Sequence, residues 1–311
     1  MLYGVKMPQV GPTLTGADVL RFAQTAERLG FDILFVGDHV VFPERIASCY
    51  PYDPGGRHPA ENVPNYVEAL TLLTYVAGAT SSIRLSPSVL ILPYRHPVLT
   101  AKIIASLDFL TRGRVILGVG AGWMREEFEA LGAPSYEQRG AITDEVLEIF
   151  KVLWTQERPR FKGRFFHFDE MRFTPKPWQK PHPPIWVGGN TRPAMRRTAR
   201  AGQGWFPVHL TPEELLPLMQ KFRALVVAEG RDPAAFDICL GVALEFARTS
   251  QPLNVPEDVI GKGHAQQMVE ELHTLARMGV TAVRFDFLTQ DVDARLEAMQ
   301  RFAKEVRPLA P

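Results

Sequence analysis

The amino-acid sequence predicts a single (β/α)8 barrel of the α/β class, extending over residues 1–311. Short apolar segments alternate with segments of helical hydrophobic spacing, and this strand–helix unit recurs eight times, the number that closes such a barrel. No Gly/Ser linker or shift in composition divides the chain into two domains. A doubly wound sheet would instead carry a glycine-rich fingerprint after its first strand, and the PQVGP segment at 8–12 does not have that pattern.

The first unit shows the pattern that the later units repeat. An apolar run from Val5 to Pro8 precedes an amphipathic helix over 18–29, and Gly30 follows where a left-handed residue ends many helices. Residues 33–36 form a continuous apolar run, as expected of a parallel strand covered on both faces. By the same reasoning we predict helices over 65–79, 98–111, 136–154, 192–201, 212–229, 265–278 and 292–307, and strands over 84–92, 114–119, 185–187, 204–208, 236–246 and 281–287.

Three connections are longer than the few residues that usually join strands and helices. They cover residues 40–64, 156–184 and 248–264, and the second is predicted to hold a small hairpin made of Phe161–Phe168 and Met171–Thr174. Long loops in a compact domain are often lids or binding loops. Because the chemistry of a barrel takes place at the carboxyl ends of its strands, we expect these insertions at that face.

Composition and charge exclude several classes of protein. The chain has 35 Lys and Arg against 34 Asp and Glu, a formal net charge of +1, so nothing favours nucleic acid or an anionic membrane as a partner. No apolar run approaches the roughly 20 residues of a membrane helix, and the N-terminus lacks a signal-peptide layout, which predicts a cytoplasmic protein. With two cysteines and no His-x-His pair at a strand end, neither a disulfide framework nor a metal site is expected.

Polar residues directly follow the predicted second strand. Asp38 and His39 come after the apolar run at 33–36, where a carboxylate beside an imidazole is placed to orient a proton donor or to bind a polar heterocycle. A capping aspartate and a half-buried structural histidine are the alternative. The position at a strand end favours a functional role.

Three alternating glycines, Gly118, Gly120 and Gly122, follow or end the strand predicted at 114–119. The missing side chains would allow a ligand to approach the backbone closely. An ordinary tight turn is the alternative interpretation of the same residues.

A second glycine-containing segment joins the strand predicted at 185–187 to a helix. It consists of Gly188, Gly189, Asn190 and Thr191. The first N–H groups of a helix attract an anion, so this junction would suit a phosphate. Asn and Thr are also common cap residues, and a purely structural cap is therefore the alternative.

Isolated polar residues within apolar runs are further candidates. His209 after the sixth strand and Arg284 in the eighth are placed to contact a substrate, although paired structural residues fit the same pattern. Glu126 and Glu127 are candidate acids, with a solvent-exposed helix face as the alternative. Lys6 in the first strand would suit a Schiff-base lyase, although a lysine whose charged end reaches the rim is the simpler explanation.

In combination and in this order, four segments resemble the luciferase-like flavin and deazaflavin oxidoreductases. They are Asp38-His39, VLILPYRHP at 89–97, GRVILGVGAGWMREEFEALG at 113–132 and PIWVGGNT at 184–191, and the resemblance extends over nearly the whole chain. It implies a (β/α)8 barrel that binds reduced FMN or coenzyme F420 at the carboxyl ends of its strands. The GVGAGW run is most similar to the branch predicted to use coenzyme F420.

The resemblance implies roles for particular residues. Asp38 and His39 would lie beside the flavin or deazaflavin ring, and the Ser88–Val89 bond would be a non-prolyl cis peptide that forms a bulge behind it. The other cofactor-binding positions implied by the motifs are Gly118, Gly120, Gly122, Gly188, Gly189, Asn190 and Thr191, of which the last four would bind the cofactor phosphate.

Departures from individual branches narrow the expected function. Trp123 stands where the glucose-6-phosphate-using enzymes resembled here have a carboxylic acid, and Val208 and Thr211 replace their Thr-x-x-Lys. The stretch at 240–242 lacks the Arg-x-His of alkanesulfonate monooxygenases, and Ala121 stands where bacterial luciferase has an arginine for the FMN phosphate. Glucose 6-phosphate is therefore not the expected substrate, and an FMN monooxygenase is less favoured than an enzyme that uses coenzyme F420.

The sequence thus predicts an oxidoreductase that transfers a hydride between coenzyme F420 and a small organic substrate, with His39 as the acid–base group. A monooxygenase that uses reduced FMN in the same pocket is the first alternative. A flavin-binding barrel without turnover, or a lyase that uses Lys6, is the second. A small-molecule substrate and one flavin-type cofactor are the expected partners, while the substrate, the direction of transfer and the oligomeric state, including a homodimer, stay open.

Overall fold

The computed structural model describes residues 1–53, 55–246 and 261–311. The strands of its main sheet are β1 (Leu2–Lys6), β2 (Ile33–Val36), β3 (Arg84–Pro87), β4 (Leu90–Ile91), β5 (Leu117–Gly120), β8 (Ile185–Gly188), β9 (Gly204–Phe206), β10 (Asp237–Ala243) and β13 (Ala282–Asp286). Every pairing among them is parallel, in the order β3-β2-β1-β13-β10-β9-β8-β5-β4.

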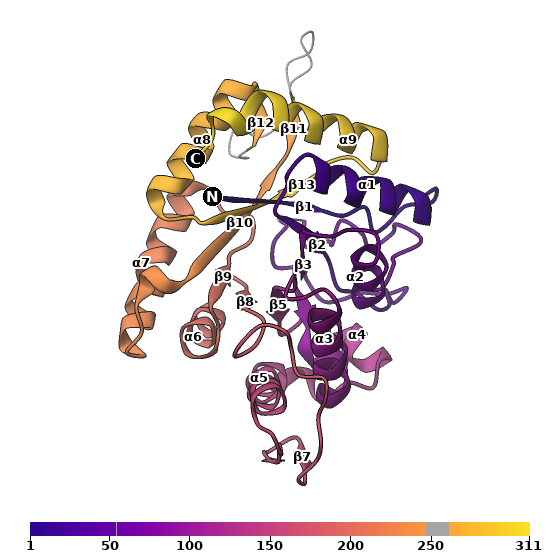
Figure 1. Cartoon of the computed structure of the whole chain (residues 1–311), viewed down its shortest axis with the longest axis vertical. Helices are drawn as coiled ribbons and strands as arrows, with labels where there is room; N and C mark the ends of the chain where they lie inside the picture. Colours follow the sequence, from indigo (N-terminus) through magenta and orange to yellow (C-terminus); the bar gives the residue numbers. More distant parts are fainter. Residues whose placement is uncertain (54, 247–260) are drawn as a thin grey trace.

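The two ends of this strand order meet, so the sheet closes into a barrel. β3 and β4 follow each other in the chain, and a further parallel bridge joins Leu85 of β3 to Val115 just before β5. Counting β3 and β4 as two parts of one strand gives the eight strands that the sequence predicts. Helices surround the strands (Figure 1), and the predicted (β/α)8 barrel is confirmed.

Local sequence signals begin and end several helices. Thr15 and Asp18 form a capping box at the start of the first helix, and Gly30 follows its end with a φ of +79°. Thr211 and Glu214 form the same box at the start of the seventh helix. Among the described residues, no helix is both long enough and apolar enough to cross a bilayer. The helices are α1 (Gly16–Arg28), α2 (Ala69–Ala77), α3 (Pro97–Leu110), α4 (Arg125–Ala130), α5 (Arg139–Thr155), α6 (Arg192–Ala201), α7 (Pro212–Ala228), α8 (Ala265–Met278) and α9 (Val292–Arg301).

Two predicted strands are each divided in the structure. The strand predicted at 84–92 is interrupted between β3 and β4, where the Ser88–Val89 peptide bond is cis, as the resemblance implies. The strand predicted at 236–246 ends with β10 at Ala243, and the next residues form β11 (Glu245–Phe246), which pairs with β12 (Lys262–Gly263) outside the barrel sheet. The sequence does not reveal such interruptions, because a continuous apolar run indicates that a segment is buried but not which strand it pairs with.

Helix boundaries differ mainly near the carboxyl ends of strands. α2 begins at Ala69, four residues later than predicted, and α5 begins at Arg139 after a 3-10 turn over 136–138. α9 leaves α geometry after Arg301 and continues as a π turn over 302–306. α4 is not among the predicted helices and was considered only as the alternative setting of Glu126 and Glu127, because its six residues are too few for hydrophobic periodicity to be visible.

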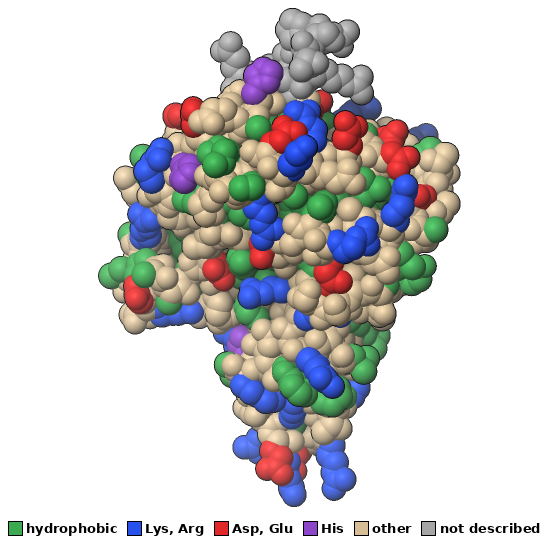
Figure 2. All heavy atoms as spheres, turned by 45° about the horizontal axis from the view of Figure 1, so that its top comes forward, with side chains coloured by type: hydrophobic (Ala, Val, Ile, Leu, Met, Phe, Trp, Pro, Cys, Tyr) green, Lys and Arg blue, Asp and Glu red, His purple; other side chains and the backbone are tan. Residues whose placement is uncertain are grey.

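The insertion at 156–184 is attached at the face opposite to the predicted one. It follows α5 and precedes β8, so it joins the barrel at the amino ends of the strands. A small hairpin is present, but its strands β6 (Phe161–Lys162) and β7 (His167–Phe168) both lie within the first predicted segment. Met171–Thr174 forms no strand, so the predicted pairing of these two segments is wrong. The hairpin extends beyond the barrel at the lower end of Figure 1, and Lys and Arg side chains gather at that end in Figure 2. Of the third predicted loop, 248–264, only residues 261–264 are among those described.

Glycines in the barrel wall leave space that neighbouring strand segments fill. A Cβ added to Gly118 would lie 2.0 Å from the carbonyl oxygen of Pro87. A Cβ on Gly120 would lie 2.5 Å from a methyl carbon of Val89, and one on Gly188 would lie 2.8 Å from the other. At these three positions the absence of a side chain therefore accommodates the chain around the cis bond, and the contact with a cofactor ring stays a prediction.

We expect Gly118→Ala to destabilise the barrel, because backbone atoms occupy the space that the methyl group needs. Overpacking of a core typically costs about 1–3 kcal/mol, which urea unfolding followed by circular dichroism measures. Gly78→Ala is the matched control, since its Cβ would meet nothing closer than the Tyr75 carbonyl oxygen at 3.9 Å, and the free energy of unfolding should change by under about 0.5 kcal/mol. Equal stability of the two variants would contradict the packing role of Gly118.

Candidate active site

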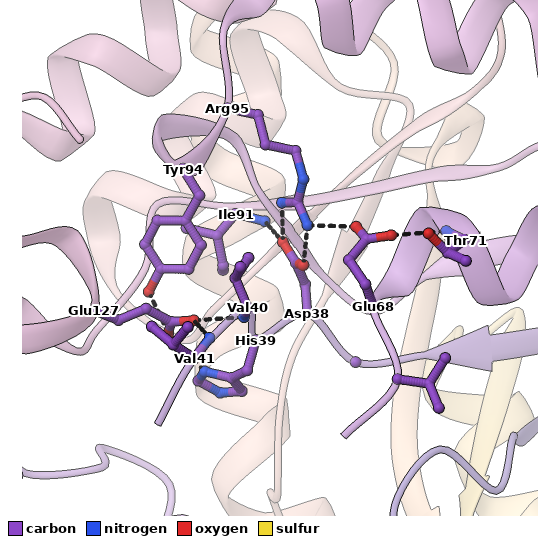
Figure 3. A network of polar contacts seen from close by, with 12 residues as sticks. Asp38, His39, Val40, Val41, Glu68, Thr71, Ile91, Tyr94, Arg95 and Glu127 are labelled. Atoms are coloured by element: carbon purple, nitrogen blue, oxygen red, sulfur yellow. Dashed lines mark hydrogen bonds and ion pairs between the residues drawn. The ribbon is translucent and has the colours of Figure 1, made fainter. Parts of the chain in front are cut away.

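A fully buried carboxylate lies beside His39 at the carboxyl end of the barrel. The side chain of Glu127 in α4 is 0% exposed, and its Oε2 atom is 2.7 Å from Nδ1 of His39 and 2.8 Å from the hydroxyl of Tyr94. Its Oε1 atom accepts the N–H groups of Val40 at 2.6 Å and Val41 at 3.2 Å. Figure 3 shows these groups converging on one side chain. The alternative of a solvent-exposed helix face is therefore wrong for Glu127.

Hydrogen bonding keeps the Glu127 carboxylate ionised and fixes the ring of His39. Burial alone would raise the pKa of Glu127, but the bonds from His39, the Val40 N–H and Tyr94 hold this pKa below its ordinary value. An ionised carboxylate only accepts hydrogen bonds, so Nδ1 of His39 donates and carries a proton. In the neutral ring Nε2 then has a free lone pair, and it has no hydrogen-bond partner among the described residues. His39 is therefore arranged to accept a proton at Nε2 and to return it.

The Asp38 carboxylate is used within the protein. It is 0% exposed and accepts two hydrogen bonds of 2.7 Å from Arg95 and one of 2.8 Å from the N–H of Ile91. Arg95 also contacts Glu68 at 2.6 Å, and Glu68 caps α2 (Figure 3). Burial opposes the charge of Arg95, but these two ion pairs raise its pKa. Asp38 thus ties the end of β2 to β4, and a cofactor contact at Asp38 would have to involve groups other than its carboxylate.

Glu126, which the sequence offers as a candidate acid, anchors the loop over 40–64. Its Oε1 atom accepts the N–H groups of Ala47 at 2.7 Å and Ser48 at 3.0 Å. Burial alone would raise the pKa of Glu126. Hydrogen bonds from the backbone and from Ser48 outweigh this effect and hold the pKa below its ordinary value. Two consecutive glutamates of α4 therefore hold two parts of the same loop.

Aromatic rings enclose His39, whose own side chain is 7% exposed. The ring centroids of Phe42 and His58 lie 4.6 Å from that of His39, and those of Tyr66 and Trp123 lie at 5.8 and 6.0 Å. Three of these rings come from residues 42–66 and the fourth from the segment before α4. This enclosure limits the access of water to the imidazole and strengthens its electrostatic interactions.

The junction between β8 and α6, which the sequence predicts to bind a phosphate, has one backbone N–H without a partner among the described residues. Gly189 has a φ of +115°, and the side chain of Asn190 exchanges two hydrogen bonds with the backbone of Val208. Thr191 caps α6 through its hydroxyl, while its own N–H has no partner among the described residues. A free N–H at the positive end of a ten-residue helix fits the phosphate of FMN and that of coenzyme F420 equally.

Three further candidate residues, Lys6, His209 and Arg284, lie near one another around Asp286. Arg284 is buried in β13, donates from Nε to Asp286 at 3.2 Å and lies 5.1 Å from the ring centroid of Phe206. Lys6, at the end of β1, has its Nζ 4.0 Å from the other carboxylate oxygen of Asp286. His209 is exposed and has a φ of +48°. The structure thus shows Arg284 as a paired residue, and substrate contact by Arg284 or His209 stays a prediction.

Comparison with known proteins identifies the family. The model of the luciferase-like monooxygenases matches residues 4–256. The chain belongs to this family. An uncharacterised protein of Mycobacterium tuberculosis is 34% identical over 209 residues, which are 67% of this chain and 71% of that protein. The FMNH2-dependent dimethylsulfone monooxygenase of Pseudomonas putida is 30% identical over 212 residues, 68% of this chain and 53% of that enzyme.

A solved structure shares the fold. An F420-dependent secondary alcohol dehydrogenase, determined with an F420–acetone adduct, superposes with a TM-score of 0.80 at 19% identity, covering 100% of this chain and 99% of that chain. One relative is therefore named for FMNH2, and the fold recurs in an enzyme named for coenzyme F420. These comparisons support a luciferase-like oxidoreductase with a flavin-type cofactor.

We expect Arg95→Met to destabilise the protein by roughly 3–5 kcal/mol, because it leaves the buried Asp38 carboxylate without its charged partner. Arg158→Met is the matched control, since Arg158 pairs with Glu170 on the surface, where the two side chains are 74% and 53% exposed. The control should lose under about 1 kcal/mol. Urea unfolding of both variants measures the difference in the free energy of unfolding. A loss of stability for Arg95→Met no larger than that for Arg158→Met would rule out a stabilising role for the Asp38–Arg95 ion pair.

Proposed function

We propose that the protein is an oxidoreductase that transfers a hydride between coenzyme F420 and a small organic substrate. The observation that carries the proposal is the His39–Glu127 pair, in which a buried carboxylate holds Nδ1 and leaves Nε2 free. When a hydride leaves or joins a carbon that bears oxygen, a proton leaves or joins the oxygen. His39 would move that proton at Nε2, and Glu127 would stabilise the imidazolium that forms.

The chain's own residues would hold and orient the cofactor. Thr191 at the N-cap of α6 would bind its phosphate through the free N–H, and the ring would lie near His39 with Val89 behind it. The N–H of Gly189 donates to the carbonyl oxygen of Phe206 at 3.1 Å and is not available to the phosphate. The deazaflavin, when bound, supplies the carbon that accepts or donates the hydride. Support for coenzyme F420 over FMN comes from the GVGAGW run at 118–123, in which Ala121 replaces the phosphate-binding arginine of bacterial luciferase.

A reduced-FMN monooxygenase is the second candidate function. The 30% identity to an FMNH2-dependent dimethylsulfone monooxygenase favours it, because no relative of comparable sequence identity described above is named for coenzyme F420. In that case the same barrel mouth and the same phosphate site would bind FMN. A flavin-binding barrel without turnover would share the binding site but would not need the free Nε2 of His39.

Equilibrium titration tests the choice of cofactor. We expect coenzyme F420 to quench the tryptophan fluorescence of the protein at lower concentration than FMN does, because Ala121 removes a contact to the FMN phosphate. Tighter binding of reduced FMN, together with oxygen uptake in the presence of substrate, would instead assign the protein to the monooxygenases. Lack of binding of either cofactor would contradict both proposals.

His39→Asn separates the proton transfer of His39 from its structural contact. The Asn amide can still donate to Glu127, whereas the Nε2 atom is lost, so we expect normal folding and F420 binding with hydride transfer slowed at least tenfold. Absorbance of coenzyme F420 follows the reaction with a panel of ketones, alcohols and activated alkenes. His167→Asn on the exposed hairpin is the control and should react like the parent. Unchanged turnover in His39→Asn would remove His39 from the reaction.

A further inference from the structure

A second histidine, which the proposed function does not use, lies against His39. The loop over 40–64 brings the ring of His58 to 4.6 Å from that of His39, with the two planes at 64°. The ring of His58 also stacks on Trp123 at 6.1 Å and meets the edge of Tyr50 at 4.9 Å. Contacts on several sides fix the position of His58 beside the acid–base residue.

Hydrogen bonding fixes the proton of His58 on one nitrogen. Nδ1 of His58 accepts the N–H of Ala60 at 3.2 Å. A ring nitrogen that accepts has no proton, so the neutral ring carries its proton on Nε2. Burial, together with the charges of His39 and Lys6, lowers the pKa of His58 to about 2. His58 therefore stays neutral near pH 7 and offers a fixed N–H donor at Nε2.

The two histidines thus present opposite groups. In His39 the N–H at Nδ1 donates a hydrogen bond to Glu127, and Nε2 has a free lone pair. In His58 Nδ1 accepts a hydrogen bond, and Nε2 carries the proton. Neither Nε2 atom has a hydrogen-bond partner within the described ranges. A hydroxyl group needs one acceptor for its proton and one donor for its oxygen, and this pair supplies both.

We infer that His58 is a second catalytic residue, and that His39 and His58 together bind one oxygen atom of a small alcohol or of the ketone formed from it. The inference rests on the proposed function and adds its substrate class. A substrate hydroxyl would donate to Nε2 of His39 and accept from Nε2–H of His58. Alkanes and activated alkenes without a hydroxyl or carbonyl oxygen make neither contact, so they are not the expected substrates.

The reaction is balanced with oxidised coenzyme F420 as the hydride acceptor. The O–H bond of the alcohol breaks and its proton passes to Nε2 of His39. The C–H bond of the same carbon breaks, its electron pair leaves with the hydrogen as hydride to the deazaflavin, and the carbon–oxygen double bond forms. The N–H of His58 stabilises the negative charge that develops on the oxygen, as a neutral imidazole does when it polarises a carbonyl group. Reduction of the ketone is the reverse.

His58→Asn removes the Nε2 donor and leaves the loop contact in place. The Asn side-chain oxygen can accept the N–H of Ala60 as Nδ1 does, so the loop should keep its structure. With propan-2-ol and acetone as probes, we expect kcat/KM to fall at least tenfold, since one donor to a developing oxyanion is typically worth about 10²–10³-fold. The dissociation constant of coenzyme F420 should change less than about twofold. His58→Gln, whose longer amide places an N–H near the former Nε2, should recover part of the loss.

Each result decides a separate question. Parent-like kcat/KM in His58→Asn, or a parent that turns over other substrates but neither probe, would overturn the inference and leave the proposed function standing. A parent without any F420-dependent turnover would overturn the proposed function. The two-bond 1H–15N spectrum of the parent then still tests His58 directly: a neutral ring with its proton on Nε2 at pH 7 is expected, and a proton on Nδ1 would overturn the assignment.

Discussion

One buried charge, the Glu127 carboxylate, determines how the segments at the carboxyl end of this barrel are arranged. A buried carboxylate is costly unless hydrogen bonds replace its water, and Glu127 receives four, from His39, Tyr94 and the N–H groups of Val40 and Val41. These bonds fix the ring of His39, the direction in which the chain leaves β2 and the place of α4. The interactions that stabilise the fold here are therefore the ones that orient His39, the proposed acid–base group.

The loop over 40–64 encloses the His39–Glu127 pair. Glu126 holds the middle of the loop while Glu127 holds its start, and the loop in turn brings His58 against His39. The two imidazoles have complementary protonation because different partners, a carboxylate and a backbone N–H, bind their Nδ1 atoms. In the proposed site, groups that do not contact the substrate thus determine which nitrogen of each ring carries the proton.

Much of the fold could be predicted from the sequence, because parallel strands buried on both faces appear as apolar runs such as 33–36. His39 could be predicted as a site residue because it directly follows such a run. Glu127 could be predicted only as one of two candidate acids, because it stands beside Glu126 in an acidic segment. Its burial could not be predicted, because its partner His39 lies 88 residues away in the chain. His58 lies in a loop without periodicity, and the short α4 gives no periodic signal either.

The tautomer of His39 tests the central claim most directly, because both the acid–base role and the pairing with His58 require a free lone pair on Nε2. Two-bond 1H–15N correlation spectra of the 15N-histidine-labelled protein, recorded where the ring is neutral, identify the protonated nitrogen without any substrate or cofactor. We expect a proton on Nδ1, hydrogen-bonded to Glu127, and an unprotonated Nε2. A neutral ring with its proton on Nε2 would contradict it.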